Sequence, residues 1–567
     1  MMSKKEKENR EIELEAEIEF IDELIEEDEK KEKVEEFMKD PKVKKSFAEV
    51  ALEFVGLQNV ELWQCEGVAY MTVEIDGHYE NFPVKSKKGR LYPARIFYDK
   101  MHKSLNKNAL DLVLNELESR ALFRGKEHQV FVRVGADQDG YIYHDLCNEN
   151  WETIRIGANG FWLDSKPPIK FIRTDNMEAL PYPDWPHLDL DHDTKQVMNF
   201  IDDILTDLFR ITNLTRDTRG QVFLIAGLIG ALRPTGPYPY IPVSGEKGSA
   251  KSSFGRIFGW FVDPRKVQLV RPPTKEQDVF VMAKNTWILA FDNASGIPPH
   301  IADAICSITT GGGFTARELY TDFEETTYNV NRLVMVNGIG NLTHRPDLLD
   351  RALPFHLKNI PSGERLTESQ VLKIFNRIQP FVMTLLYLTV ANGLRQQGKI
   401  NLKSLPRMAD FATWIYACLE DNDLFCEFTT PEIFLDYMES SISEVWDEIL
   451  ETDPFSKALL EYLDNNPKLK EVRTYDLWDG IIDAAGVDRY NIPDGLPRAS
   501  KSLWSFVERA APVIRDARGI DLQRTVKNKV MMVQINRPNS EPPEQKQETF
   551  DSAESNRSQI ILTPESN

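Results

Sequence analysis

Residues 244–253 read SGEKGSAKSS, a stretch that comes close to the phosphate-binding loop pattern. Gly245, Lys251 and Ser252 stand where that pattern needs them, but Ala250 occupies a position where the pattern has glycine. The flanking residues read as a strand, YIPVS, and as a helix, SSFGRIFGWFV. A strand, a tight turn and a helix N-terminus together present backbone N–H groups to phosphates. The stretch therefore predicts a nucleotide site at the end of a strand.

The loop also predicts the role of each residue. Lys251 would reach the outer phosphates of ATP, and the Ser252 hydroxyl would hold Mg²⁺. The extra methyl of Ala250 is tolerated if this residue has helical dihedral angles, because only positive φ strictly demands glycine. The residues expected to line the nucleotide are Gly245, Glu246, Lys247, Gly248, Ser249, Ala250, Lys251, Ser252 and Ser253.

Two later apolar runs end in polar residues that such a site needs. NTWILAFDN at 285–293 places Asp292 at the end of a buried strand, where a second magnesium-coordinating carboxylate is expected. NRLVMVNG at 331–338 ends in Asn337, which is placed to orient the attacking water or the γ-phosphate. We therefore predict Ser252 and Asp292 as metal ligands and Asn337 as a catalytic sensor.

Arginines follow the sensor strand in HRPDLLDRALPFHL at 344–357. A guanidinium from Arg351, or from Arg345, could cross a subunit boundary and stabilise the phosphoryl transition state. Each could equally be a solvated surface cation.

Taken together, the loop, ILAFDN, residues 311–338 and RPDLLDRA resemble the AAA+ ATPase domain of superfamily 3 helicases. They are more similar still to the ATP-binding replication proteins of phages and integrated elements. The resemblance covers about 194–420, including LPRMADFATW. It implies a homo-hexameric ring with Mg-ATP between subunits, and a hairpin from Phe314 to Asn331 that grips DNA in the pore, with Arg317, Tyr320 and Phe323 as DNA-binding candidates.

The chain departs from that family in two places. The hairpin tip, YTDFEE, is acidic, which does not suit phosphate contact, so the hairpin could instead stabilise a subunit interface. Asn293 stands where many relatives have a second acid; it can orient water but cannot take its proton. Either another carboxylate such as Asp303 supplies that role, or turnover is slow.

Composition limits the remaining possibilities. The 567 residues carry a net charge of -21, of which -9 lies in residues 1–40. This acidic total argues against a histone-like coat on nucleic acid, although a local basic patch could still bind it. The five cysteines form no CxxC pair, which favours a reducing cytoplasm over a zinc ribbon or disulfide scaffold. The apolar runs at 222–232 and 381–394 are shorter than a bilayer span, so we expect buried helices and no membrane.

The patterns along the chain predict a multidomain protein: an α/β AAA+ P-loop core, an N-terminal α+β accessory domain and a C-terminal winged helix. The expected segments are an acidic helix at 1–40 that is either solvated or partner-binding, the accessory domain at 45–185, the ATPase core at 194–360, a helical lid at 361–450, the winged helix at 454–536 and a disordered tail at 537–567.

The C-terminal segment reverses the charge of the chain. Residues 498–537 carry nine Lys or Arg against three acids. The segment resembles a winged helix, with Arg498 and Lys501 at the start of its recognition helix, Trp504 and Val507 on the buried face of that helix, and a basic wing after it. DNA binding is one reading, and a basic face on a packing module is the other. The DNA-binding candidates in this segment are Arg498, Lys501, Arg524, Lys527 and Lys529.

These residues predict an ATP-dependent DNA helicase or translocase acting in replication of a phage or integrated element, on single-stranded or forked DNA. The alternative is a slowly hydrolysing, nucleotide-gated DNA-binding switch or loader, which Asn293 and the acidic hairpin favour. A primase fused to a helicase would need a carboxylate cluster in 45–185, and the sequence shows none there.

Overall fold

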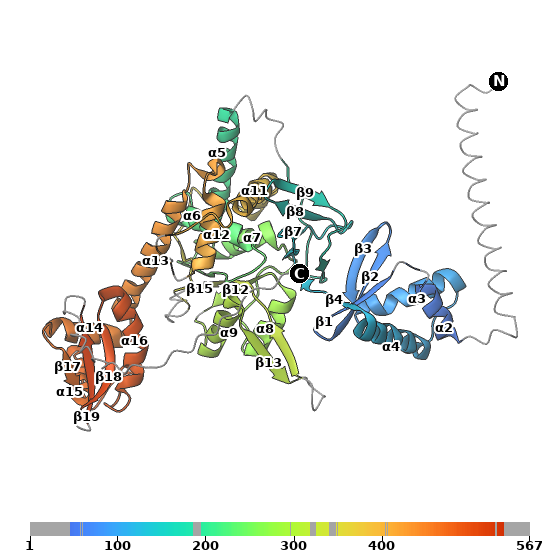
Figure 1. Cartoon of the computed structure of the whole chain (residues 1–567). Helices are drawn as coiled ribbons and strands as arrows, with labels where there is room; N and C mark the ends of the chain where they lie inside the picture. Colours follow the sequence, from blue (N-terminus) through green and yellow to red (C-terminus); the bar gives the residue numbers. More distant parts are fainter. Residues whose placement is uncertain are drawn as a thin grey trace, which may run out of the picture. The chain divides into compact units, whose positions relative to one another are not determined.

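The computed structural model describes residues 46–537 except for 57, 59, 185–193, 295, 318–324, 339–347, 349, 403, 405, 407 and 528–529 (Figure 1). The segments expected to form the acidic helix and, beyond Arg537, the tail lie outside the described residues, as do Tyr320, Phe323, Arg345 and Lys529. The chain forms two compact units, Met1–Ile442 and Ser443–Asn567.

The first unit begins with a small α+β module. Its sheet has the order β3-β2-β1-β4, in which β1, β2 and β3 are antiparallel and β4 is parallel to β1. Met71 and Val73 of β2 face a core that is shared with the three helices, because alternate residues of a strand point to one side. The elements are α2 (Phe47–Gly56), β1 (Glu61–Cys65), β2 (Val68–Ile75), β3 (His78–Pro83), α3 (Lys87–Met101), α4 (Lys107–Arg124) and β4 (Lys126–Glu127).

The next six short strands form two small sheets, one of which packs with the central core of the first unit. An antiparallel sheet has the order β6-β7-β8-β9, while β5 and β10 form a parallel pair. Val134, Ile142, Ile154 and Ile156 belong to the same hydrophobic core as the helices after 194, so packing does not divide at residue 185. The strands are β5 (Val130–Phe131), β6 (Val134–Ala136), β7 (Ile142–Asp145), β8 (Thr153–Gly157), β9 (Gly160–Asp164) and β10 (Lys170–Phe171).

The centre of the unit is an all-parallel sheet with the order β12-β15-β11-β16. It is buried on both faces: Leu333 and Met335 of β15 join one core with α6 and α7, and Val334 and Val336 join another with α8 and α9. This explains the continuous apolar runs of the sequence. The elements are α5 (Thr194–Ile211), α6 (Thr218–Ala231), β11 (Tyr240–Gly245), α7 (Lys251–Val262), α8 (Glu276–Asn285), β12 (Ile288–Ala294), α9 (Pro299–Thr310), β15 (Leu333–Gly338) and β16 (Phe355–Leu357).

Between α9 and β15 an antiparallel hairpin forms from β13 (Gly313–Arg317) and β14 (Glu325–Asn329), in register from Gly313 opposite Asn329 to Arg317 opposite Glu325. Helices α11 (Glu368–Gln396) and α12 (Ala409–Leu419) complete the unit, with a short 3₁₀ turn at Asp423–Phe425. Helix α13 (Pro431–Thr452) begins in the first unit and continues past Ile442 into the second. Among the described helices, α11 alone is long and apolar enough to cross a membrane, and 67% of its apolar window is buried in the core.

The second unit contains three further helices and a three-stranded antiparallel sheet of order β17-β19-β18. Leu503, Val507 and Ile514 form the buried stripe of α16, at helical spacing. Strand β17 adds a third strand to the hairpin of β18 and β19. The elements are α14 (Pro454–Asn465), β17 (Glu471–Arg473), α15 (Thr474–Ala484), α16 (Leu503–Arg518), β18 (Asp521–Lys527) and β19 (Val530–Asn536).

Candidate nucleotide site

The loop between β11 and α7 leads into the N-terminus of a helix, and two of its glycines have positive φ. Gly245 has φ 147 and Gly248 has φ 87. A Cβ on Gly245 would lie 2.3 Å from the carbonyl oxygen of Leu357, so the close approach of β16 requires glycine there. Ser249 is buried, and both its backbone N–H and its hydroxyl donate to the carbonyl of Glu246, which fixes the turn.

Ala250 has φ 64 and ψ 27, in the left-handed region, and caps the N-terminus of α7. The condition for tolerating the methyl group without strain, helical dihedral angles, is therefore not met. A left-handed conformation costs an L-residue with a Cβ about 1–2 kcal/mol, whereas glycine adopts these angles freely. The methyl group is retained at the cost of local backbone strain.

Lys251, the first residue of α7, folds back onto the loop. Its Nζ donates to the carbonyl oxygens of Gly245 at 2.7 Å and Glu246 at 2.8 Å. Burial lowers the pKa of Lys251 from its ordinary value, and the nearby Asp292 carboxylate partly opposes that shift. The ammonium thus satisfies the loop carbonyls at the position where the sequence predicts phosphate.

Ser252, in the first turn of α7, lies next to Asp292, near the carboxyl end of β12. The Ser252 hydroxyl donates to Oδ1 of Asp292 at 3.1 Å, although 40 residues separate them. A hydroxyl and a carboxylate are hard oxygen ligands of the kind Mg²⁺ takes, and magnesium sites combine one or two carboxylates with substrate phosphates. The described residues contain no group of three or more His, Cys, Asp or Glu side chains that could hold a metal ion alone. This pair fits a metal that a nucleotide helps to hold.

Asn293 and Asn337 join the same network. The backbone N–H of Asn293 donates to Oδ1 of Asp292 at 2.8 Å and to Oδ1 of Asn337 at 3.1 Å. Asn293 itself has φ 57, which an asparagine adopts more readily than most residues, and it lies within the register shift of β12 between Phe291 and Ala294. Asn337 is 1% exposed, and its Nδ2 has no hydrogen-bond partner among the described residues. A buried amide N–H₂ without an acceptor is the kind of group that a ligand or water satisfies.

Two residues that the sequence did not single out also contact the loop. Nδ2 of Asn213 donates to the carbonyl oxygens of Ser249 at 3.1 Å and Lys358 at 2.7 Å. Arg365 lies close to the loop: a Cβ added to Gly248 would be 3.6 Å from its Nη2. Asn213 lies two residues beyond the end of α5 and has φ 61, so its contact with the loop depends on tertiary packing that no motif records.

Other predicted residues lie elsewhere. The carbonyl of Arg351 accepts from the N–H of Tyr240 at the first residue of β11, whereas the loop follows the last residue of that strand. Arg351 therefore starts from the opposite edge of the sheet and is not joined to Lys251 within one chain. Asp303 is exposed on α9.

The DNA-binding candidates fall in two places. Arg317 ends β13, next to the tip of the hairpin. In the second unit α16 begins at Leu503, so Arg498 and Lys501 lie in the preceding turn rather than on the helix. Arg498 pairs with Asp494 and Lys527 with Glu471, both at the surface. Arg524 lies 5.6 Å from the ring of Trp504, which is half-buried rather than fully buried.

Comparisons with known proteins give one family match. Residues 205–432 match the model of the actinomycete integrative conjugative element replication protein. No curated protein matches the sequence.

The solved structures that resemble the chain include two apo forms of the C-terminal region of NrS-1. One has 8% identity and a TM-score of 0.37 and covers 87% of this chain and 100% of its own. The other has 9% identity and a TM-score of 0.36 and covers 87% and 99%. The matched family segment, which runs from α5 into α13 and includes the nucleotide loop, supports a replication protein of a mobile element.

Proposed function

We propose that this chain is an ATP-driven DNA helicase or translocase that forms a ring and serves replication of a mobile element. The observation that carries the proposal is the meeting of Lys251, Ser252, Asp292 and Asn337 at the carboxyl ends of three parallel strands. That edge is where α/β sheets bind ligands. The family match over 205–432 supports the link to replication.

Mg-ATP fits the residues at this edge. When bound, it would supply the free energy of phosphoryl transfer. Lys251 would exchange the loop carbonyls for phosphate oxygens, and Ser252 and Asp292 would hold the metal. Asn337 would use its unpartnered Nδ2 to orient the terminal phosphate or the attacking water. Asn293 donates its backbone N–H to the side chains of Asp292 and Asn337, so it positions them.

A ring would complete the site. Arg351 lies at the amino end of β11, so its guanidinium could serve the site of a neighbouring subunit rather than its own. The hairpin β13–β14 belongs to the same unit as the loop and would transmit the nucleotide state to DNA. Three helices with a basic hairpin in the second unit support a winged helix that recruits DNA.

A slowly hydrolysing switch is the second candidate, because one observation favours it. Asn293 occupies the position beside Asp292 and cannot accept a proton from water. In that case nucleotide binding, not turnover, would control the grip on DNA.

Steady-state phosphate release, measured with and without single-stranded DNA, separates these candidates. Strong stimulation by DNA supports the motor, whereas tight ATP binding with negligible turnover supports the switch. Lys251→Ala should abolish both ATP turnover and tight ATP binding without unfolding the chain, because it removes the phosphate-binding ammonium. Lys275→Ala, a matched exposed lysine at the N-cap of α8, should leave turnover unchanged. Full ATP turnover in Lys251→Ala would remove the site assignment.

A further inference from the structure

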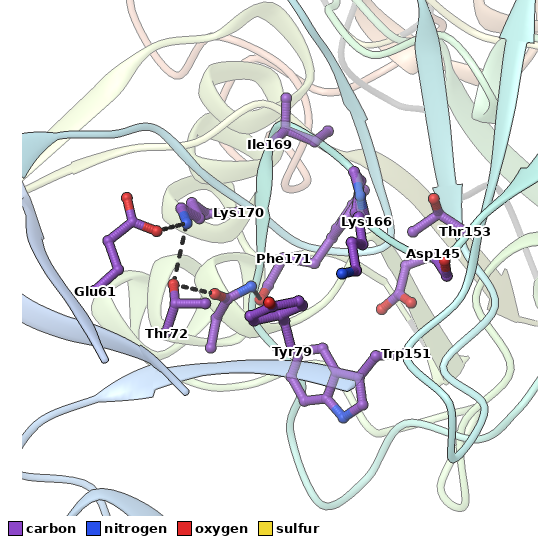
Figure 2. Close-up of a pocket in the computed structure, with 13 residues that line it drawn as sticks. Glu61, Thr72, Tyr79, Asp145, Trp151, Thr153, Lys166, Ile169, Lys170 and Phe171 are labelled. Atoms are coloured by element: carbon purple, nitrogen blue, oxygen red, sulfur yellow. Dashed lines mark hydrogen bonds and ion pairs between the residues drawn. The ribbon is translucent and has the colours of Figure 1, made fainter. Parts of the chain in front are cut away.

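A cavity of about 190 Å³ lies between the sheet of the N-terminal module and the segment that leads to β10 (Figure 2). Tyr79 of β3 forms one wall, Trp151 forms another, and Lys166 reaches in from the loop after β9. Its volume is below the roughly 300–1,000 Å³ of pockets for drug-sized ligands. It therefore suits a single ring system, and it is far too small for ATP.

The polar floor of this cavity is already hydrogen-bonded internally. The Thr72 hydroxyl donates to Asn81 Oδ1 at 2.7 Å, and Asn81 Nδ2 donates to the carbonyl of Phe171 at 3.1 Å. Lys170 pairs with Glu61, and Asp145 receives two nitrogens of Arg173. Because these groups are already paired within the protein, they do not select a ligand by its hydrogen-bonding groups. Recognition would depend on ring stacking, which every base supports.

Lys166 is the exception, because its charge is not compensated. Its Nζ lies 4.9 Å from the centroid of the Tyr79 ring and forms no ion pair among the described residues. The two acids of the lining, Glu61 and Asp145, are each paired with another cation. An aromatic face with a cation above it can exchange that cation for a base, and the ammonium can then pair with a phosphate.

Trp151 adds a second, independent sign of a built site. It is 9% exposed and has φ 57, which is an outlier for a bulky aromatic residue. Arg173 stacks on its ring at 4.1 Å and holds it in place. Strained backbone of this kind persists where the surrounding contacts force it, often at ligand sites.

We propose that this cavity, which we call the Tyr79 pocket and define by Tyr79, Trp151 and Lys166, binds one unstacked base of single-stranded DNA, with Lys166 on the adjoining phosphate. The inference rests on the proposed function in that the chain must bind DNA. It assigns to the N-terminal module a strand-holding role that is separate from the nucleotide loop. A base must leave a duplex to enter the pocket, so single strands are bound and duplexes are not.

Anisotropy of a fluorescein-labelled oligothymidylate with the full chain tests the pocket. Tyr79→Ala should weaken binding by about 5- to 150-fold, the range for loss of one stacked base, whereas Tyr79→Phe keeps the ring and should stay within about twofold of wild type. Lys166→Ala should lower the salt dependence by about one phosphate contact. Tyr98→Ala and Lys103→Ala, exposed on the helical side of the same module, are the matched controls and should change nothing. Melting temperatures establish that each variant is folded.

The outcomes separate this inference from the proposed function. If the wild-type chain does not bind the oligonucleotide, both fail. If it binds and Tyr79→Ala binds equally well, the pocket is overturned and the proposed function stands. Equal weakening by Tyr79→Phe would assign the effect to the hydroxyl and overturn stacking. Tighter binding of oligouridylate than of oligothymidylate would overturn the assignment to DNA.

Discussion

Replacement of Asp263 by asparagine tests what holds the segment before residue 185 onto the parallel sheet. Asp263 follows α7, and its side chain is fully buried. Its carboxylate accepts from Nε of Arg133 at 3.0 Å and from Nε of Arg265 at 2.9 Å, as well as from the backbone N–H of Trp287 at 2.9 Å. Burial raises the pKa of Asp263, but the two guanidinium groups outweigh it and hold the pKa below its ordinary value.

Asparagine has the same shape, so this change removes the charge and leaves two buried guanidinium groups uncompensated. Loss of one partner of a buried pair costs about 3–5 kcal/mol. With an unfolding entropy of about 2.1 cal/mol/K per residue over roughly 400 residues, the melting temperature of the first unit should fall by about 4–6 °C.

Differential scanning calorimetry of the full chain measures this shift. Asp111→Asn is the control, since Asp111 pairs with Arg90 at 2.9 Å but both side chains are about two-fifths exposed. A surface pair contributes about 1 kcal/mol or less, so this variant should shift by about 1 °C at most. If Asp263→Asn also melts within about 1 °C of wild type, the buried pair does not hold this segment and the reasoning is refuted.

Three further predictions concern the site and the core. Ala250→Gly should stabilise the chain by about 0.5–1 kcal/mol, because relief of the left-handed strain exceeds the cost of the added chain entropy. Ala94→Gly, inside α3, should destabilise the chain. If both variants change the free energy of unfolding in the same direction in thermal denaturation, Ala250 is not strained. His144 donates from Nε2 to Val262 and accepts from Tyr387 at Nδ1, and burial lowers its pKa to about 4. Stability should therefore be complete above pH about 6.5 and fall by about 3 kcal/mol as the pH drops towards 4, and His144→Gln should flatten that part of the profile. Mixing inactive Arg351→Ala and Lys251→Ala chains should restore some ATP turnover if the arginine acts in trans, and absence of recovery would leave Arg351 without a role.

Local patterns predicted the residues of the site because each of them ends or begins a regular element. Asp292 and Asn337 follow uncharged apolar runs, and parallel strands bring such ends to one edge. The dihedral angles of Ala250 could not be predicted in this way, since the angle is set by the turn into α7 rather than by the residue. The contact of Asn213 with the loop likewise depends on how α5 packs.

The boundary predicted at 185 shows the same limit more clearly. A change from short strands to helices marks a change of secondary structure, and it predicts the end of a domain there. The buried Arg133 lies 130 residues from Asp263, and no periodicity or motif relates them. Contacts of this range decide which strands share a core, so the division of the chain had to come from the structure.

The hydrogen bonds of the nucleotide loop also set the cost of occupying it. Lys251 donates two strong hydrogen bonds to loop carbonyls, and Ser252 donates one to Asp292. Under the proposed function, a triphosphate and its metal must replace these three contacts, while the buried Nδ2 of Asn337 is a side-chain donor that has no hydrogen-bond partner among the described residues. Each replaced hydrogen bond contributes about 0.5–1.5 kcal/mol net, or up to about 3 kcal/mol with a charged group. The apparent affinity for ATP is therefore lower than the full set of contacts would give, and release of the nucleotide is eased by the return of the same three bonds.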